Sequence, residues 1–150
     1  MENSLYPVFG IPTAVPSNTH DGAYKPAPFF DFETGDFKRD GANRVVMADG
    51  REAYREWVVK MLNTPHGACE AYPQLGLDHE KAAAETNRGA VEAIFERVIT
   101  ECLLRHPMTQ RVREFSFAWA SDELTIDFVV QGKNLPAMPV RYIAHGGGRN

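Results

Sequence analysis

EFSFAWASDELTIDFVV, residues 114–130, is the stretch that decides the fold class of this chain. Large apolar residues alternate with smaller or polar ones on both sides of Ser121-Asp122, a pair typical of turns. The large apolar residues are Phe115, Phe117, Trp119, Leu124, Ile126, Phe128 and Val130. This period of two predicts a β-hairpin with one buried face.

Shorter strands are predicted on both sides of the hairpin. Residues 138–144 alternate in the same way, and Pro139 places that third strand at a sheet edge because proline cannot donate to a ladder. Nearer the start of the chain, the phenylalanine-rich residues 29–32 predict a strand that runs into a turn. Residues 44–47 are predicted to be its return strand.

Three helices are predicted between the two groups of strands. Residues 88–104 repeat apolar side chains at three-four spacing, with Thr86 or Asn87 as the N-cap. Residues 51–63 carry a second such stripe, and 79–85 have high helix propensity. Because strands and helices are segregated, the fold class is α+β: a small antiparallel sheet packed on two or three helices.

Composition narrows the function. The chain has 150 residues, 16 Lys+Arg against 20 Asp+Glu and two cysteines. That length suits one domain, and a net charge of −4 argues against a general binder of nucleic acid or membrane surfaces. No apolar run is long enough to span a membrane, and residues 1–16 do not resemble a signal peptide. Two cysteines fit a protein made in a reducing compartment.

Half of the 10 prolines precede Phe29. Proline disfavours helices and central strands, so this region is expected to be extended. It is either a floppy leader or an arm that lays Tyr6, Phe9 and Ile11 on a partner. The sequence therefore divides into an extended proline-rich arm, an α+β domain and a flexible tail: residues 1–28, 29–144 and 145–150.

Two enzyme-like or metal-binding alternatives arise from scattered side chains. Metal ligands for a zinc-stabilised adaptor domain would come from His66, Cys69, His79, Cys102 and His106. A peptidoglycan hydrolase would pair Glu70 with Asp78 or Glu80 as acid and base. Neither set has a specific motif, Cys102 is expected to be a buried inert thiol, and nucleophile and phosphate-binding motifs are absent. We therefore expect no enzyme, no cofactor and no metal.

Exposed strand edges are the remaining candidate for function. An edge has unpaired backbone donors and acceptors, which proteins usually blunt. Residues 44–47 and 138–144 are the two candidate edges. At the second edge, either Pro139 and Arg141 prevent pairing or a strand from another chain extends the sheet. The residues themselves leave both interpretations open.

Several phrases occur in a distinctive order. They are Asp31-Phe32-Glu33-Thr34-Gly35-Asp36-Phe37, Asp49-Gly50, Ala53, Trp57, Leu62-Asn63-Thr64, Ala71-Tyr72-Pro73 and Gly76-Leu77, then the long helix and the hairpin. In this order, over about residues 29–144, the chain resembles the small baseplate wedge proteins of contractile phage tails. That family is also called the sheath initiators, or the "lysozyme-like" baseplate proteins.

The resemblance implies a structural subunit of the virion tail baseplate, assembled in the host bacterial cytoplasm and present in several copies, with six expected. Its implied partners are the tail sheath protein and baseplate wedge proteins, with tail tube or hub proteins as further neighbours. In the family the sheet accepts strands from sheath arms and so templates sheath assembly. The acceptor predicted here is Met138, Val140, Arg141 and Tyr142.

One motif departs from the family pattern. Many relatives carry a Glu-Pro-Arg triplet after the long helix, where this chain has HPMTQRV at residues 106–112. Arg111 is predicted to keep the arginine's role in wedge contact, but the Glu-Pro pair is missing at its side. The lysozyme label gains no support from the residues, because no acid-plus-nucleophile pair stands out.

Overall fold

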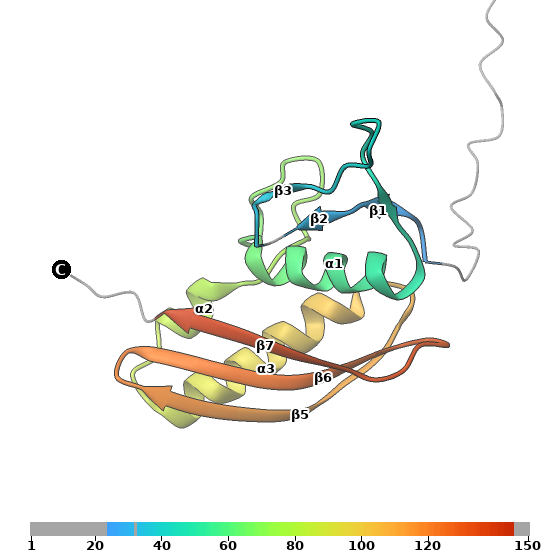
Figure 1. Ribbon diagram of the computed structural model, residues 1–150. Helices are drawn as coiled ribbons and strands as arrows, with labels where there is room; N and C mark the ends of the chain where they lie inside the picture. Colours follow the sequence, from blue (N-terminus) through green and yellow to red (C-terminus); the bar gives the residue numbers. More distant parts are fainter. Residues whose placement is uncertain (1–23, 32, 146–150) are drawn as a thin grey trace, which may run out of the picture.

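The computed structural model describes residues 24–31 and 33–145 (Figure 1). Its elements in order are β1 (Ala27–Pro28), β2 (Phe30–Asp31), β3 (Asp36–Phe37), β4 (Met47–Ala48), α1 (Gly50–Asn63), α2 (His79–Ala83), α3 (Arg88–Leu104), β5 (Thr109–Ala120), β6 (Glu123–Gly132) and β7 (Met138–His145). The predicted α+β class is confirmed. No described helix is long and apolar enough to cross a membrane.

The main sheet is an antiparallel meander in the order β5-β6-β7. The central strand β6 alternates without a break between buried and half-buried residues. Its buried side chains are at most 2% exposed: Leu124, Ile126, Phe128 and Val130. They pack with α3, which lies across this inner face of the sheet (Figure 1). The hairpin predicted from residues 114–130 is therefore confirmed.

Helices α1 and α3 complete the core. α3 has the bounds predicted from the sequence, and the Asn87 side chain caps it by accepting hydrogen bonds from the N–H groups of Gly89 and Ala90. Asp49 occupies the N-cap position of α1, but its side chain makes no capping hydrogen bond. α1 lies between α3 and the small strands near the start of the described chain (Figure 1).

The first four strands form a small module whose pairing differs from the sequence prediction. Residues 29–32 were expected to pair with 44–47. Only Phe29 bonds to that segment, at Val46, while β2 pairs with β3 and the preceding β1 pairs with β4. The segments meet in a closed ring of backbone hydrogen bonds: Phe29 N–H to Val46 O, Val46 N–H to Lys38 O, and Lys38 N–H to Phe29 O, each 2.8–2.9 Å. The bonds join three segments, around Phe29, Lys38 and Val46. A hairpin pairs only two segments, so a hairpin pattern in the sequence could not predict this arrangement.

Tyr24 joins this end of the chain to the main sheet. Its hydroxyl donates to the Lys133 carbonyl at 2.6 Å, and its ring packs edge-on against Tyr54 at 5.3 Å. Residues 24–28, which the sequence assigned to the arm, are thus packed on the domain. Likewise His145, assigned to the tail, ends β7. The predicted residues Tyr6, Phe9 and Ile11 lie outside the described part of the chain.

Gly132 makes room for Tyr24, because a Cβ at position 132 would overlap the Tyr24 hydroxyl. We expect Gly132→Ala to lower the free energy of unfolding by about 1–3 kcal/mol, as overpacking usually does. Gly41→Ala is the matched control, since a Cβ there meets nothing within 4 Å. Urea unfolding of both variants tests this, and equal stabilities would show that Tyr24 is not held at this site.

Candidate functional site: the free edge of the sheet

β7 has a partner on one side only. It pairs with β6 from Met138 to His145, and no described residue pairs with its other edge. The register shows no shift over these eight residues, so the free edge is straight and regular. Such an edge is a template on which another chain can add a strand.

The predicted acceptor residues do not share one face. Met138 is buried, and Val140 and Tyr142 are half-buried against the core, while Arg141 points to solvent on the other face. The exposed face of β7 instead presents Pro139, Arg141 and Ile143, whose side chain is 43% exposed. Ile143 was missed, although the alternation from Met138 onward already indicated its outward position.

Pro139 indicates which backbone groups face the free edge. It lies opposite Val129 in the ladder but has no N–H, and proline is tolerated where its nitrogen faces away from the neighbouring strand. The direction of the backbone groups alternates along an antiparallel strand, so Arg141 and Ile143 share this outward orientation. A strand added at this edge would hydrogen-bond to them.

The opposite edge of the sheet, β5, is irregular. Its register with β6 shifts twice, between Thr109 and Arg111 and between Arg113 and Ser116. In the second bulge Glu114 has a positive φ of 60°, which bends the strand. Bulges of this kind discourage strand addition. β7 is therefore the better acceptor edge of the two.

Arg111 lies on this irregular strand. Its side chain is exposed and has no ion-pair partner among the described residues. β6 separates it from β7, so the predicted wedge contact and the predicted strand acceptor occupy opposite edges of one sheet. One subunit could thus contact two neighbours without overlap.

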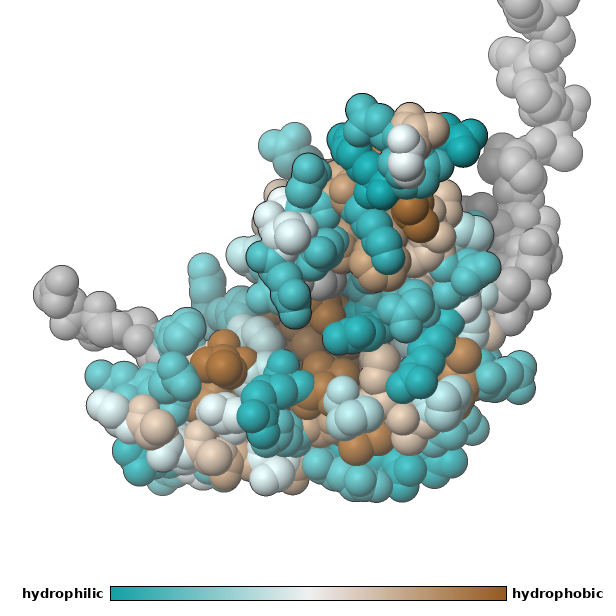
Figure 2. All heavy atoms as spheres, viewed as in Figure 1, coloured by the Kyte–Doolittle hydropathy of each residue, from teal (hydrophilic) through white to brown (hydrophobic). Residues whose placement is uncertain are grey.

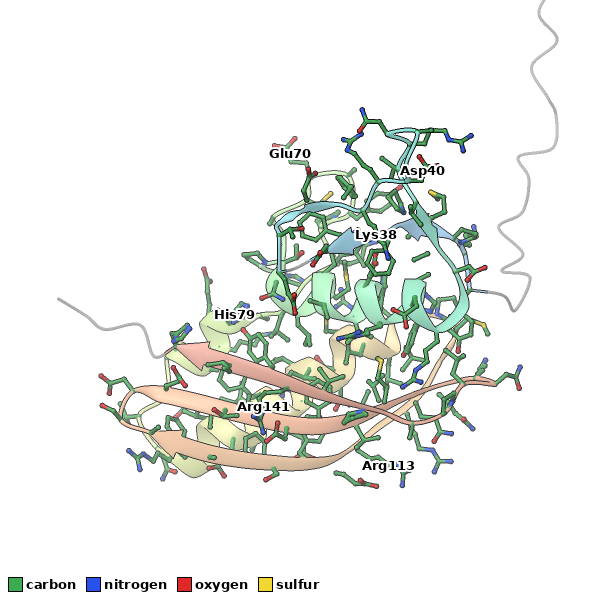
Figure 3. The ribbon with its side chains drawn as sticks, viewed as in Figure 1. Lys38, Asp40, Glu70, His79, Arg113 and Arg141 are labelled. Atoms are coloured by element: carbon green, nitrogen blue, oxygen red, sulfur yellow. The ribbon has the colours of Figure 1, made fainter. Side chains whose placement is uncertain are left out.

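The solvent face of the sheet carries paired charges. Arg141 contacts Asp127, directly opposite on β6, through two hydrogen bonds of 2.7 and 3.1 Å (Figure 3). These bonds to the arginine side chain hold the pKa of Asp127 below its usual range. On β5, Arg113 pairs with Glu114 at 2.9 Å. Arg141 is thus already neutralised within its own subunit, so it does not present a free cation.

The inner side of β7 is tied to α2. The Tyr142 hydroxyl lies 3.1 Å from His79 Nδ1, and burial raises the pKa of Tyr142 and lowers the pKa of His79. His79, considered above as a metal ligand, instead supports the strand from behind. Nothing in the local sequence indicated this contact, because the two residues are 63 positions apart.

The other enzyme-like and metal-binding residues do not converge. Within the described part of the chain, no three His, Cys, Asp or Glu residues are placed to hold a metal ion. Cys102 is buried, with its pKa raised by that burial, while Cys69 is exposed. Glu70 points outward from its loop, away from His79 (Figure 3). Asp78 forms an ion pair with Lys81 at 2.9 Å, which lowers its pKa and makes it a poor general acid.

Comparison with known proteins shows the family of this chain. The family model described as contractile injection system sheath initiator matches residues 28–134, more than two thirds of the chain. The chain belongs to the sheath initiator family. Sheath initiators are structural, which places the chain among the baseplate proteins of contractile tails and confirms the family expected from the sequence motifs.

A solved structure shares the fold. It comes from Geobacter sulfurreducens and is provisionally named a tail lysozyme; the match has a TM-score of 0.58 and 15% identity, and covers 71% of this chain and all of the other. At that identity the likeness concerns the fold alone. A search of curated proteins gave no match.

The Asp127–Arg141 pair can be tested by titration. We expect Arg141→Gln to raise the pKa of Asp127 toward the ordinary value for aspartate, measured by carboxyl-carbon NMR. The pKa is depressed in the fold, so the pair's stabilisation is present at neutral pH and is lost as pH falls below about 4. Asp40, whose pKa is lowered by its own neighbours around Arg44, is the internal control and should not move. An unchanged Asp127 titration would contradict the pairing.

The hydrolase alternative has its own test. We expect purified protein to release no muropeptides from peptidoglycan at any pH between about 4 and 8. Glu70 points away from His79, the neighbour of Asp78 and Glu80 in the chain, and Asp78 is held by Lys81. Glu70→Gln is the control variant. Release that disappears in this variant would contradict the structural assignment.

Proposed function

We propose that this sheath initiator links baseplate wedge proteins to the first sheath ring and starts the sheath by accepting strands from sheath arms along β7. The observation that carries the proposal is the regular, unpartnered edge of β7 beside a second edge that bulges disrupt. Membership in the sheath initiator family supports the proposal, because an added strand would use an edge such as that of β7, which runs over eight residues.

Strand addition would use the backbone for affinity and the side chains for selection. The outward N–H and C=O groups of Arg141 and Ile143 would pair with the arriving strand. Its side chains would then lie next to the apolar Ile143 and the neutralised Arg141–Asp127 pair on the solvent face. An arriving strand with an apolar residue beside Ile143 fits this surface better than one with a charge there.

The other contacts that we propose, with wedge proteins and with neighbours in the baseplate, are assigned from where the residues lie in the chain and the sheet. Arg111, whose side chain has no ion-pair partner among the described residues, is proposed to face a wedge protein. Tyr6, Phe9 and Ile11 of the arm are proposed to contact neighbours in the assembled baseplate. Six copies around the tail tube or hub, assembled in the host bacterial cytoplasm, would satisfy rotational closure of such head-to-tail contacts. No nucleic-acid or membrane partner forms part of this proposal.

A proline substitution separates strand acceptance from folding. We expect Ile143→Pro to keep the fold, because the N–H that it removes faces the free edge, and to prevent sheath assembly in particles carrying it. Ile143→Ala is the matched control. Both substitutions remove the isoleucine side chain, but alanine keeps the backbone N–H that proline lacks. Circular dichroism and thermal unfolding check the fold, and electron microscopy of tails checks the sheath.

Two outcomes would contradict the proposal. Sheaths of normal length on Ile143→Pro particles would show that β7 is not the acceptor. Unfolding of the purified Ile143→Pro subunit would show that the N–H of Ile143 is bonded to β6. The backbone groups of Arg141 and Ile143 would then face β6 and not the free edge.

A further inference from the structure

An aromatic groove lies where the described chain begins, away from the free edge of β7. It has a volume of about 370 Å³. We call this pocket the aromatic groove. Its wall includes Tyr24, Pro26, Tyr54, Trp57, Leu75, His106 and Pro107. Lys25 and Arg105 flank it. On the face shown in Figure 2 the surface is largely polar, with one gathering of strongly hydrophobic residues between the small-strand module and the sheet.

The rings of the groove are held rigidly by one another. Trp57 and His106 meet edge to face with centroids 4.6 Å apart, and Tyr54 stacks nearly parallel to Trp57 at 6.2 Å. The Tyr54 hydroxyl is fixed by Thr109 at 2.6 Å. A wall of pre-stacked rings binds at low conformational cost because little side-chain freedom remains to be lost.

Trp57 also has an available donor. Its indole N–H has no hydrogen-bond acceptor among the described residues, whereas the N–H of Trp119 donates to Glu92 at 2.8 Å. Aromatic grooves with such a donor suit extended, proline-containing segments, whose rings pack on the aromatic faces and whose carbonyls remain free to accept.

Such a segment exists in this chain. Residues 5–16, LYPVFGIPTAVP, contain three prolines and no charged side chain, although 24% of the whole chain is charged. Leaving Leu5, Tyr6, Phe9 and Ile11 in water would expose a contiguous apolar surface, which soluble proteins rarely do. The groove wall between Lys25 and Arg105 is rich in aromatic rings and prolines, which suits this composition.

The connection is long enough for the segment to return to its own subunit. Residues 17–23, SNTHDGA, join it to Tyr24, which itself forms part of the groove wall. Seven residues span up to about 23 Å, and Asp21-Gly22 is a dipeptide typical of turns. A segment tethered this closely has an effective concentration of the order of millimolar. It therefore outcompetes the same segment of another copy in dilute solution.

We propose that in the free subunit the aromatic groove is the docking site for the chain's own residues 5–16. Docking there would keep the arm's apolar side chains out of water until the subunit meets its neighbours. The proposal is independent of strand acceptance at β7, because the two surfaces share no residue.

The two tryptophans of the chain provide the test. In the full-length, nitrogen-15-labelled protein, we expect the combined substitution Tyr6→Ala, Phe9→Ala and Ile11→Ala to shift the indole NMR signal of Trp57 and leave that of Trp119 in place. The matched control alters the polar connection (Ser17→Ala, Asn18→Ala and Thr19→Ala) and should shift neither signal. An unlabelled peptide of residues 5–16, added to the first variant, should restore the Trp57 signal.

Two results would overturn the proposal. A Trp57 signal that the arm substitutions do not move, and that the peptide does not move either, means that the groove holds some other ligand or none. A Trp57 signal of the unsubstituted protein that changes on tenfold dilution means that the segment comes from another copy, not from its own chain.

Discussion

Burial of β6 against α3 is the interaction on which the rest of this structure depends. Leu124, Ile126, Phe128 and Val130 leave water completely, and burying each such side chain contributes about 1.5–3 kcal/mol. A strand that slipped by one residue would turn all four toward solvent and bring Thr125, Asp127 and Val129 inside. Burial therefore fixes the register of β6, and β6 in turn fixes the strands on both sides.

That constraint separates the two faces and the two edges of the sheet. With the register fixed, the inward residues of β7 support the core and its outward residues carry the Arg141–Asp127 pair and Ile143. The edge of β5 is interrupted by bulges, while the edge of β7 remains regular. This asymmetry favours the strand acceptance proposed for β7, because the bulges suppress unwanted pairing at the other edge.

Much of this was predictable, because it rests on local periodicity. The helix at 88–104 and the hairpin after it follow from spacing alone, and the ordered motifs indicated the sheath initiator family. The pairing of residues 29–32 with 44–47 was right only at Phe29, which bonds to Val46; Phe30 and Asp31 pair with β3 instead, because three segments share the hydrogen bonds. The boundary at residue 28 missed Tyr24, whose hydrogen bond joins it to a carbonyl 109 positions away. Ile143 was overlooked, although its alternation with the buried Met138 and Ala144 was visible in the sequence.

Local patterns were enough to predict the α+β class, the main hairpin, the helix at 88–104 and the family, because period-two and three-four spacings report local geometry and because the motifs follow one another in a fixed order. Tertiary packing set which edge of the sheet is regular and brought His79 against Tyr142. It also brought Tyr24, Tyr54, Trp57 and His106 into one groove. These features join residues that are far apart in the chain. Their distances are set by how the helices and the sheet pack together, which no local pattern encodes.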